Sequence, residues 1–280
     1  MRAKWQKQVG EFLPEFIART PALAAISDDL DVVFHGSTTL GIDDAWSDLD
    51  LWALVSEESL AKADALSPTR FYELMLDGKR GHLNLEARRK VCEGVNACDM
   101  HRIAELRSAM VLRDCSGTAG RLIGLAQRPM SEAVRRVWTC YHYVEMRSEH
   151  RACDTPIERG DSSALLLAMT PALEHALRCA MVIDGKPYPY RKWLSKAARQ
   201  TPTGARVQEK LEQMLDLLAT GALRCTGPEK MHPVSLKLRE IRSILVEAAI
   251  ASGIDEPWLH QWWLWMPQAR EGISRVRWDA

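Results

Sequence analysis

The chain has 280 residues, a length that suits one large domain or two modest ones. Hydrophobic residues make up 46% of it, enough to bury a core, and 37 Lys and Arg residues balance 37 Asp and Glu residues to a formal net charge of zero. This balance argues against a protein that coats long nucleic acid, which usually has a basic excess, although a basic pocket can exist within a neutral total.

The cysteines and the apolar segments indicate the compartment. Seven cysteines are scattered without a CxxC pair or a zinc-ligand spacing, so we expect free thiols in a reducing environment. The N-terminal segment is too polar for a signal peptide, and the longest apolar run, SSALLLAM, is too short to cross a membrane. We therefore expect a cytoplasmic protein without a membrane partner.

Short apolar and alternating stretches predict a mixed α/β domain in the first part of the chain. We expect an amphipathic helix that contains Pro14, two strands separated by a loop, a connecting helix, a hairpin, and a helix followed by a short strand that ends at Asp114. In that order the ranges are 4–20, 30–36, 38–47 for the loop, 48–55, 57–66, 71–91 with the turn at 77–81, and 96–114.

Helical patterns dominate after about residue 120. Ser131 and Asp161 are predicted to cap two of these helices, Pro171 is expected to kink one, and a Gly/Pro-rich break covers 184–194. The expected helices are 118–126, 131–151, 161–183, 204–219, 234–252 and 256–266. The sequence thus predicts an α+β fold, with a mixed sheet and flanking helices in residues 1–120 and a helical bundle in residues 121–280.

Two aspartates separated by one leucine begin the strand predicted at 48–55. Residues two apart in a strand point to the same side, so Asp48 and Asp50 project together while Leu49 and Leu51 face the core. Adjacent carboxylates repel each other unless a cation lies between them, and hard oxygen ligands favour Mg²⁺. The pattern predicts a Mg²⁺ site that can neutralise phosphates. The alternative is that both aspartates are ordinary solvated residues on an edge strand.

The strand predicted at 30–36 ends in a glycine, and a serine follows it. Gly36 allows the backbone to approach a phosphate closely, and Ser37 adds a hydroxyl and a backbone N–H, with partial positive charge if a helix begins there. Ser47 precedes Asp48 and is expected to help orient a carboxylate. We therefore predict that Gly36, Ser37 and Ser47 bind the phosphates of a nucleotide.

These residues carry a resemblance. A strand that ends in Gly-Ser, followed after ten residues by DLDL, resembles the signature of the DNA polymerase beta-type nucleotidyltransferase superfamily. The helical region, GKPYPYRKWL in particular, is similar to bacterial aminoglycoside and lincosamide nucleotidyltransferases and their uncharacterised relatives. The resemblance covers the first 115 residues best and extends loosely to about 195. It implies a catalytic domain at 1–120 and a helical substrate-binding domain at 121–280, with the acceptor between them.

The resemblance also implies a third carboxylate from a later strand, which acts as general base toward the acceptor hydroxyl. Glu86 is the only acid in HLNLEAR and is predicted to be that residue, although the superfamily more often has an aspartate. His82, on the same strand face, is the alternative base, and a surface role for Glu86 stays open. Leu40 stands where relatives often have an arginine, so Lys192 is predicted to supply charge to the triphosphate.

The resulting expectation is an enzyme that moves an NMP from an NTP, with ATP expected, to a hydroxyl of a small-molecule acceptor such as an antibiotic or a biosynthetic intermediate. Pyrophosphate is released and Mg²⁺ is the cofactor. The alternatives are a protein or tRNA acceptor, or a catalytically silent nucleotide-binding module of the same fold. The tryptophan-rich segment 258–265 is expected to be core or the contact of a homodimer.

Overall fold

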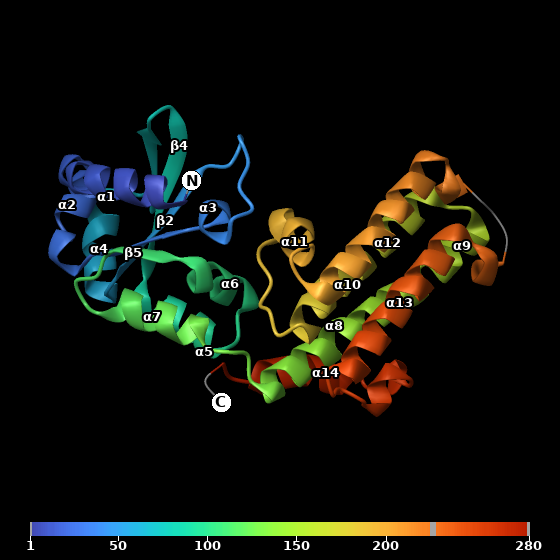
Figure 1. Cartoon of the computed structure of the whole chain (residues 1–280). Helices are drawn as coiled ribbons and strands as arrows, with labels where there is room; N and C mark the ends of the chain where they lie inside the picture. Colours follow the sequence, from blue (N-terminus) through green and yellow to red (C-terminus); the bar gives the residue numbers. More distant parts are fainter. Residues whose placement is uncertain (1, 225–227, 279–280) are drawn as a thin grey trace. The chain divides into compact units, whose positions relative to one another are not determined.

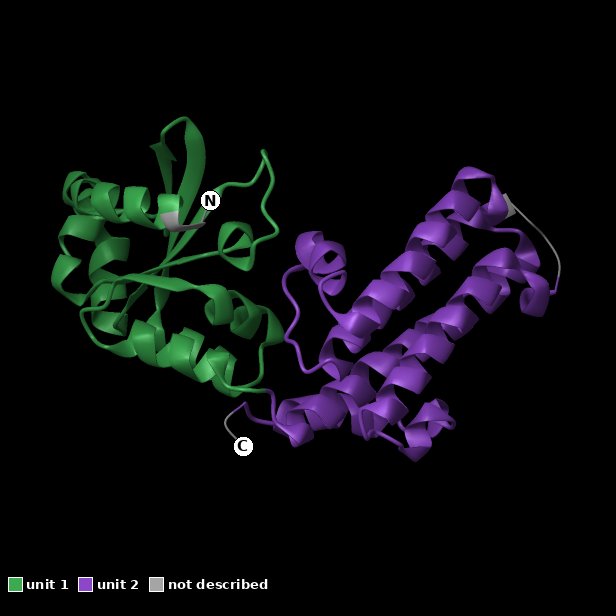
Figure 2. Ribbon diagram, viewed as in Figure 1, with its two compact units in different colours: residues 1–129, 279 green, residues 130–278, 280 purple. Residues whose placement is uncertain are grey.

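The computed structural model describes residues 2–224 and 228–278. It divides the chain into two compact units, with the division after Pro129 (Figure 2). The predicted division at residue 120 falls inside helix α7 (Thr118–Gln127), which packs against strand β1 and helix α6 of the first unit. Because those contacts bind α7 to the sheet, the first unit extends to the end of this helix.

The first unit is built on a five-stranded mixed sheet with the order β3-β4-β2-β1-β5. Strands β2, β4 and β5 of this sheet are labelled in Figure 1. Strands β2 and β4 run parallel, whereas the other neighbouring pairs run antiparallel. With the helices that follow, this sheet confirms the predicted α+β class. The strands are β1 Asp31–His35, β2 Leu49–Val55, β3 Phe71–Leu76, β4 Lys79–Ala87 and β5 Met110–Arg113.

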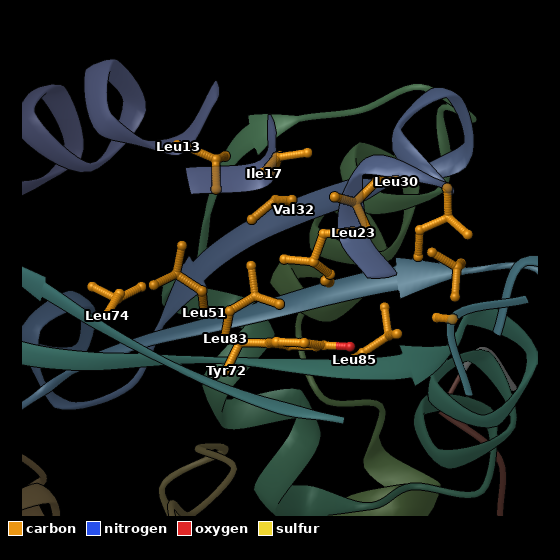
Figure 3. Packing of buried hydrophobic residues seen from close by; sticks show 14 of the residues in the cluster. Leu13, Ile17, Leu23, Leu30, Val32, Leu51, Tyr72, Leu74, Leu83 and Leu85 are labelled. Carbon is orange, nitrogen blue, oxygen red and sulfur yellow. The ribbon is translucent and has the colours of Figure 1, made fainter. Parts of the chain in front are cut away.

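One face of the sheet carries an apolar core. Alternate strand residues such as Val32, Leu51 and Leu83 pack against Leu13 and Ile17 of the first helix, as Figure 3 shows. This period of two is the pattern expected for a sheet with one face in a core. The helices that contribute buried side chains to this cluster are α1 Arg2–Arg19, α2 Pro21–Ala24 and α4 Glu57–Leu66.

The opposite face of the sheet carries several polar side chains, some of them close to the Gly-Ser turn (Gly36 and Ser37). The residues that alternate with the core positions include His35 on β1, Asp50 and Trp52 on β2, and His82 and Glu86 on β4. The helices of this unit outside the apolar cluster are α3 Ser37–Leu40, α5 Arg88–Asn96, α6 Met100–Ser108 and α7. Buried polar groups need hydrogen-bond partners or contact with water or a ligand. We therefore expect a functional site on this face of the sheet.

Three local predictions differ from the structure. The hairpin turns at Asp77 and Gly78 alone, and both have positive φ angles of 49° and 75°, which favours a tight two-residue turn over the predicted five-residue one. A single turn of helix, α3, lies in the predicted loop at 38–47. Helix α5 follows β4 directly and was not predicted, since its strongly basic start reads as the end of a strand.

The second unit is helical. Ser131 and Asp161 accept hydrogen bonds from the backbone N–H groups of Val134 and Ala164, which confirms both predicted caps. The segment expected as a helix at 256–266 instead forms two short 3-10 turns. The elements are α8 Glu132–Ala152, α9 Asp154–Arg159, α10 Ser162–Ile183, α11 Arg191–Ala198, α12 Pro202–Ala219, η2 Ala222–Arg224, η3 Glu229–Met231, α13 Pro233–Ala251, η4 Pro257–Leu259, η5 Trp262–Leu264 and α14 Met266–Arg275.

Helix α10 is the centre of this unit. Its 22 residues include an apolar window that, by length and composition alone, could cross a membrane. Half of that window is buried, and α10 packs against α8, α12 and α13. Burial by neighbouring helices is what the central helix of a bundle requires.

An ion-pair network fixes the far end of the sheet. The carboxylate of Asp31 is completely buried, and it lies 2.7 Å from Arg88 Nε and 2.9 Å from the backbone nitrogen of Ser116. Arg88 also contacts a carboxylate oxygen of Asp29 at 2.5 Å. The network therefore joins β1 to the start of α5 and to the turn after β5.

We expect Arg88→Ala to destabilise the first unit by about 3–5 kcal/mol, because it leaves a buried carboxylate without its cation. Arg89→Ala is the matched control, since the Arg89 side chain is 71% exposed and pairs only at the surface with Glu57 and Glu93. Hydrogen exchange of the β1 amides in denaturant measures the first unit alone. Equal losses in the two variants would contradict this assignment.

Candidate metal centre

Three side chains meet where β2 and β4 run side by side. Asp48 immediately precedes β2, Asp50 lies in β2, and His82 lies opposite Asp50 in the parallel register of β4. His82 Nε2 is 2.9 Å from Asp50 Oδ1, and His82 Nδ1 is 3.5 Å from Asp48 Oδ2. One ligand atom from each residue lies within 4.8 Å of the others, so the three can share one cation.

The donor atoms fit a divalent cation. Two carboxylates supply the hard oxygen ligands that Mg²⁺ prefers, and both are only partly buried, so water or a phosphate can reach the remaining positions. The imidazole of His82 adds a nitrogen donor, which also suits zinc or iron. The predicted projection of Asp48 and Asp50 to a common place is confirmed by this geometry.

The turn after β1 is shaped by Asp50. Gly36 has φ of 87° and ψ of −160°, a conformation that residues with a side chain strongly avoid. A Cβ atom at this position would lie 2.1 Å from Asp50 Oδ2. The carboxylate therefore lies directly against the backbone of the Gly-Ser turn, and only glycine permits this approach.

The serines near this turn have different surroundings. The hydroxyls of Ser37 and Thr38 are buried and have no hydrogen-bond partner among residues 2–224 and 228–278. Ser47 Oγ instead donates to Asp44 Oδ1 at 3.0 Å and accepts from the Asp44 N–H at 2.9 Å. Ser47 thus closes the turn that leads to Asp48, whereas the sequence predicted that it orients a catalytic carboxylate.

The prediction that Glu86 is the third acid of this cluster is corrected by the structure. Glu86 pairs with Leu54 at the far end of β2, four residues along β4 from His82, a separation of about 13 Å. Arg102 binds both of its oxygens, at 2.7 and 3.2 Å. Burial would raise the pKa of Glu86, but the bonds from Arg102 outweigh it and hold the pKa below its usual value.

A buried pair beside Asp50 was missed from the sequence. His35 Nδ1 lies 3.7 Å from Glu105 Oε2, and neither atom has a hydrogen-bond partner in the described part of the chain. Burial, and then the charge of Asp50, raises the pKa of Glu105 to about 8, while burial lowers the pKa of His35 to about 4. Both groups are therefore uncharged near neutral pH. His35 directly precedes Gly36, which is a visible signal, but nothing in the sequence around Glu105 indicates this contact.

A cavity of about 600 Å³ opens beside the cluster. Asp48 and His82 line it together with the aromatic rings of Trp46 and Phe71, and Trp46 is 95% exposed. The Phe71 ring stacks on His82 with centroids 4.8 Å apart. The other residues that line the cavity are Trp5, Ala45, Ser47, Asp77, Gly78, Lys79 and Arg80. The volume lies in the range of pockets that hold small molecules.

Lys192 belongs to the second unit. It is the second residue of α11, where its Nζ lies 5.5 Å from the ring centroid of Trp193. Its contact with a triphosphate stays a prediction. The neighbouring Tyr188 is buried, and its hydroxyl lies 2.9 Å from His142 Nε2, so this ring belongs to the interior of the helical unit.

The chain is similar to solved structures but not to a family model or a curated protein. No protein-family model matches it, and no curated protein matches it. Among solved structures, it is similar to a crystal structure of a nucleotidyltransferase-like protein from Exiguobacterium sibiricum 255-15. The TM-score is 0.48 and the sequence identity is 14%, over 89% of this chain and 76% of that chain. A similarity this low adds nothing to what the side chains of the site indicate.

We expect Gly36→Ala to lower the affinity of the cluster for a divalent cation at least tenfold, because the added Cβ displaces the Asp50 carboxylate. Gly41→Ala is the matched control. Gly41 also has a positive φ, of 72°, but an added Cβ meets no atom within 4 Å. Calorimetric titration with Mn²⁺ measures the effect, and equal affinities of the two variants would contradict it.

We expect the metal-free first unit to lose stability as the pH rises from 6.5 to about 8, because folded Glu105 keeps a proton that it releases on unfolding. The sign follows from the raised pKa of Glu105, whose ordinary value is 4.5. His35 titrates near pH 4 when folded and at 6.5 when unfolded, so it contributes little in this window. Denaturant unfolding of the wild type and of Glu105→Gln measures this, and parallel curves would refute it.

Proposed function

We propose that the chain is a metal-dependent nucleotidyltransferase that moves the NMP of an NTP to a hydroxyl of a small-molecule acceptor and releases pyrophosphate. One observation carries the proposal: two members of the Asp48, Asp50 and His82 cluster, Asp48 and His82, line a cavity large enough for a small molecule. The Gly-Ser turn adds support, since the Asp50 carboxylate lies against the backbone of Gly36, where the chain can approach a phosphate closely.

The residues have distinct roles in this proposal. Asp48 and Asp50 hold the divalent cation, with Mg²⁺ expected, and its positive charge neutralises the phosphates of the nucleotide when it is bound. Gly36 and Ser37 place the polyphosphate beside the carboxylates through the turn at the end of β1. Ser47 keeps the loop before Asp48 in place by its two hydrogen bonds to Asp44.

His82 replaces Glu86 as the proposed general base, and in this role it does not bind the cation, which Asp48 and Asp50 hold. Its Nε2 lies 2.9 Å from Asp50 Oδ1, and the residue also lines the cavity. Imidazole is the side chain that commonly transfers protons near neutral pH. The acceptor hydroxyl loses its proton to the imidazole and attacks the α-phosphorus, and the bond to pyrophosphate breaks. The carboxylates then stabilise the imidazolium that forms.

The substrates are assigned by chemistry. ATP is the expected nucleotide, and the acceptor is an antibiotic or a biosynthetic intermediate. The exposed rings of Trp46 and Phe71 suit the flat part of a substrate, and Lys79 adds a positive charge at the same cavity. Lys192 is proposed to reach the triphosphate. A protein or tRNA acceptor is the alternative within the same reaction, and we place the reaction in the cytoplasm.

A catalytically silent nucleotide-binding module is the second candidate. No third carboxylate joins Asp48 and Asp50 in a metal-sized group in the part of the chain that the structure describes. Glu86 is neutralised by Arg102, and His82 occupies the strand position opposite Asp50. Such a module would bind a nucleotide but transfer nothing.

The test is the incubation of the whole protein with each α-labelled NTP, Mg²⁺ or Mn²⁺, and a cell extract that contains acceptors. We expect label transfer that Asp50→Asn abolishes, because the cation is lost, and that EDTA stops. Asp43→Asn is the matched control, since it makes the same change of charge in the loop before β2 but lies outside the cluster and the cavity.

Two further variants separate the base from the structural acid. His82→Gln should reduce transfer by about 10²-fold or more, whereas Glu86→Gln should lower stability and leave the rate largely unchanged. Nucleotide binding without transfer, in every NTP and metal combination, would favour the silent module. Transfer that survives Asp50→Asn would refute the proposed metal centre.

A further inference from the structure

A second cavity, of about 210 Å³, lies within the helical unit among α8, α9, η3 and α13. It is strongly basic. Five cations line it against two carboxylates, an excess of three positive charges in a chain whose net charge is zero. The lining residues are Arg147, His150, Arg151, Asp154, Glu229, Lys230, Arg239 and Arg242.

Both carboxylates of this cavity are already paired. Arg239 Nη2 contacts the two oxygens of Glu229 at 2.8 and 2.9 Å. Arg151 Nη1 lies 2.7 Å from Asp154 Oδ2. The three remaining cations, Arg147, Arg242 and Lys230, form no ion pair with an acid of residues 2–224 or 228–278. The positive excess therefore belongs to these three side chains.

Arg147 is held by a neutral partner. Its Nη1 lies 3.2 Å from His150 Nδ1, and His150 Nε2 lies 3.3 Å from the hydroxyl of Ser235. Burial, and then the charge of Arg147, lowers the pKa of His150 to about 4, so this histidine carries no charge near neutral pH. His150 can therefore accept a bond from the guanidinium without adding a sixth positive charge.

The Nε of Arg147 is buried and has no hydrogen-bond partner among the described residues. Burial, and then the charge of Arg242, lowers the pKa of Arg147, which means that its environment opposes the charge. Like charges one helical turn apart repel each other, as Arg147 and Arg151 do on α8 and Arg239 and Arg242 on α13. A partly buried group of this kind is stabilised by an anion that accepts the unused N–H groups.

We propose that this cavity is a binding site for a phosphate group, separate from the metal centre of the first unit. Guanidinium groups match phosphate oxygens in a bidentate geometry and are weakly hydrated, so arginines suit a partly buried phosphate better than lysines do. A volume of about 210 Å³ corresponds to roughly seven water molecules. It accommodates inorganic phosphate or pyrophosphate, or the terminal phosphate of a larger molecule, but it is smaller than a whole nucleotide requires.

The experiment titrates the full chain with inorganic phosphate, pyrophosphate and malonate in EDTA, so that no divalent cation brings phosphate to the acidic cluster. We expect saturable binding of at least one phosphate compound, a rise in Tm with its concentration, and at least tenfold weaker binding of malonate. Comparison of phosphate with pyrophosphate shows which source of the group is preferred.

Variants locate the site. Arg242→Gln and Lys230→Gln should each weaken phosphate binding, Arg242→Gln at least tenfold, and both should retain the helical circular dichroism signal. Arg147→Gln should do the same if it folds. Arg206→Gln is the matched control, because Arg206 is an exposed residue of the same unit that pairs with Glu247 on its surface. Asp50→Asn should bind phosphate as the wild type does.

Three results would overturn the proposal. The first is the absence of saturable binding at millimolar phosphate and pyrophosphate. The second is binding that Arg242→Gln and Lys230→Gln leave unchanged, since the phosphate would then lie elsewhere. The third is malonate binding as tight as phosphate binding, which would assign the cavity to carboxylates. None of these results depends on whether the first unit transfers nucleotides.

Discussion

The candidate metal centre depends on the close approach of the Asp50 carboxylate to the backbone of Gly36. This approach brings the end of β1 and the start of β2 together at a distance that no side chain at position 36 allows. A helical turn begins directly after Gly36, at Ser37. The polar face of the sheet, the turn and the acidic cluster are thus parts of one arrangement.

On the polar face of the sheet, the charged side chains form two groups at different positions along the strands. Asp50 and His82 lie at one end, and Glu86 with Arg102 lies toward the other. Trp52 stands between them, 4.2 Å from the ring centroid of His35 and 5.6 Å from the guanidinium carbon of Arg102. Because Arg102 neutralises Glu86, this carboxylate stabilises the unit, whereas Asp48 and Asp50 are partly exposed and contact His82.

The two units use electrostatics in opposite ways. The first brings two carboxylates together at the start of β2, where a cation can stabilise them, and the second gathers arginines in a small cavity, where an anion can do so. The neutral total charge of the chain hides both sites. Composition therefore carries information about the whole surface but little about pockets of a few side chains.

The sequence by itself determined the features that depend on neighbours along the chain. The period of two in a strand places Asp48 and Asp50 on one side, and the caps at Ser131 and Asp161 need only the helix that follows them. Tertiary structure alone decided the rest. The parallel pairing of β2 with β4 places His82, and not Glu86, opposite Asp50, because strand register depends on residues that are far apart in the sequence. Packing of α13 on α8 likewise brought together arginines that lie about ninety residues apart, and no local pattern encodes such a contact.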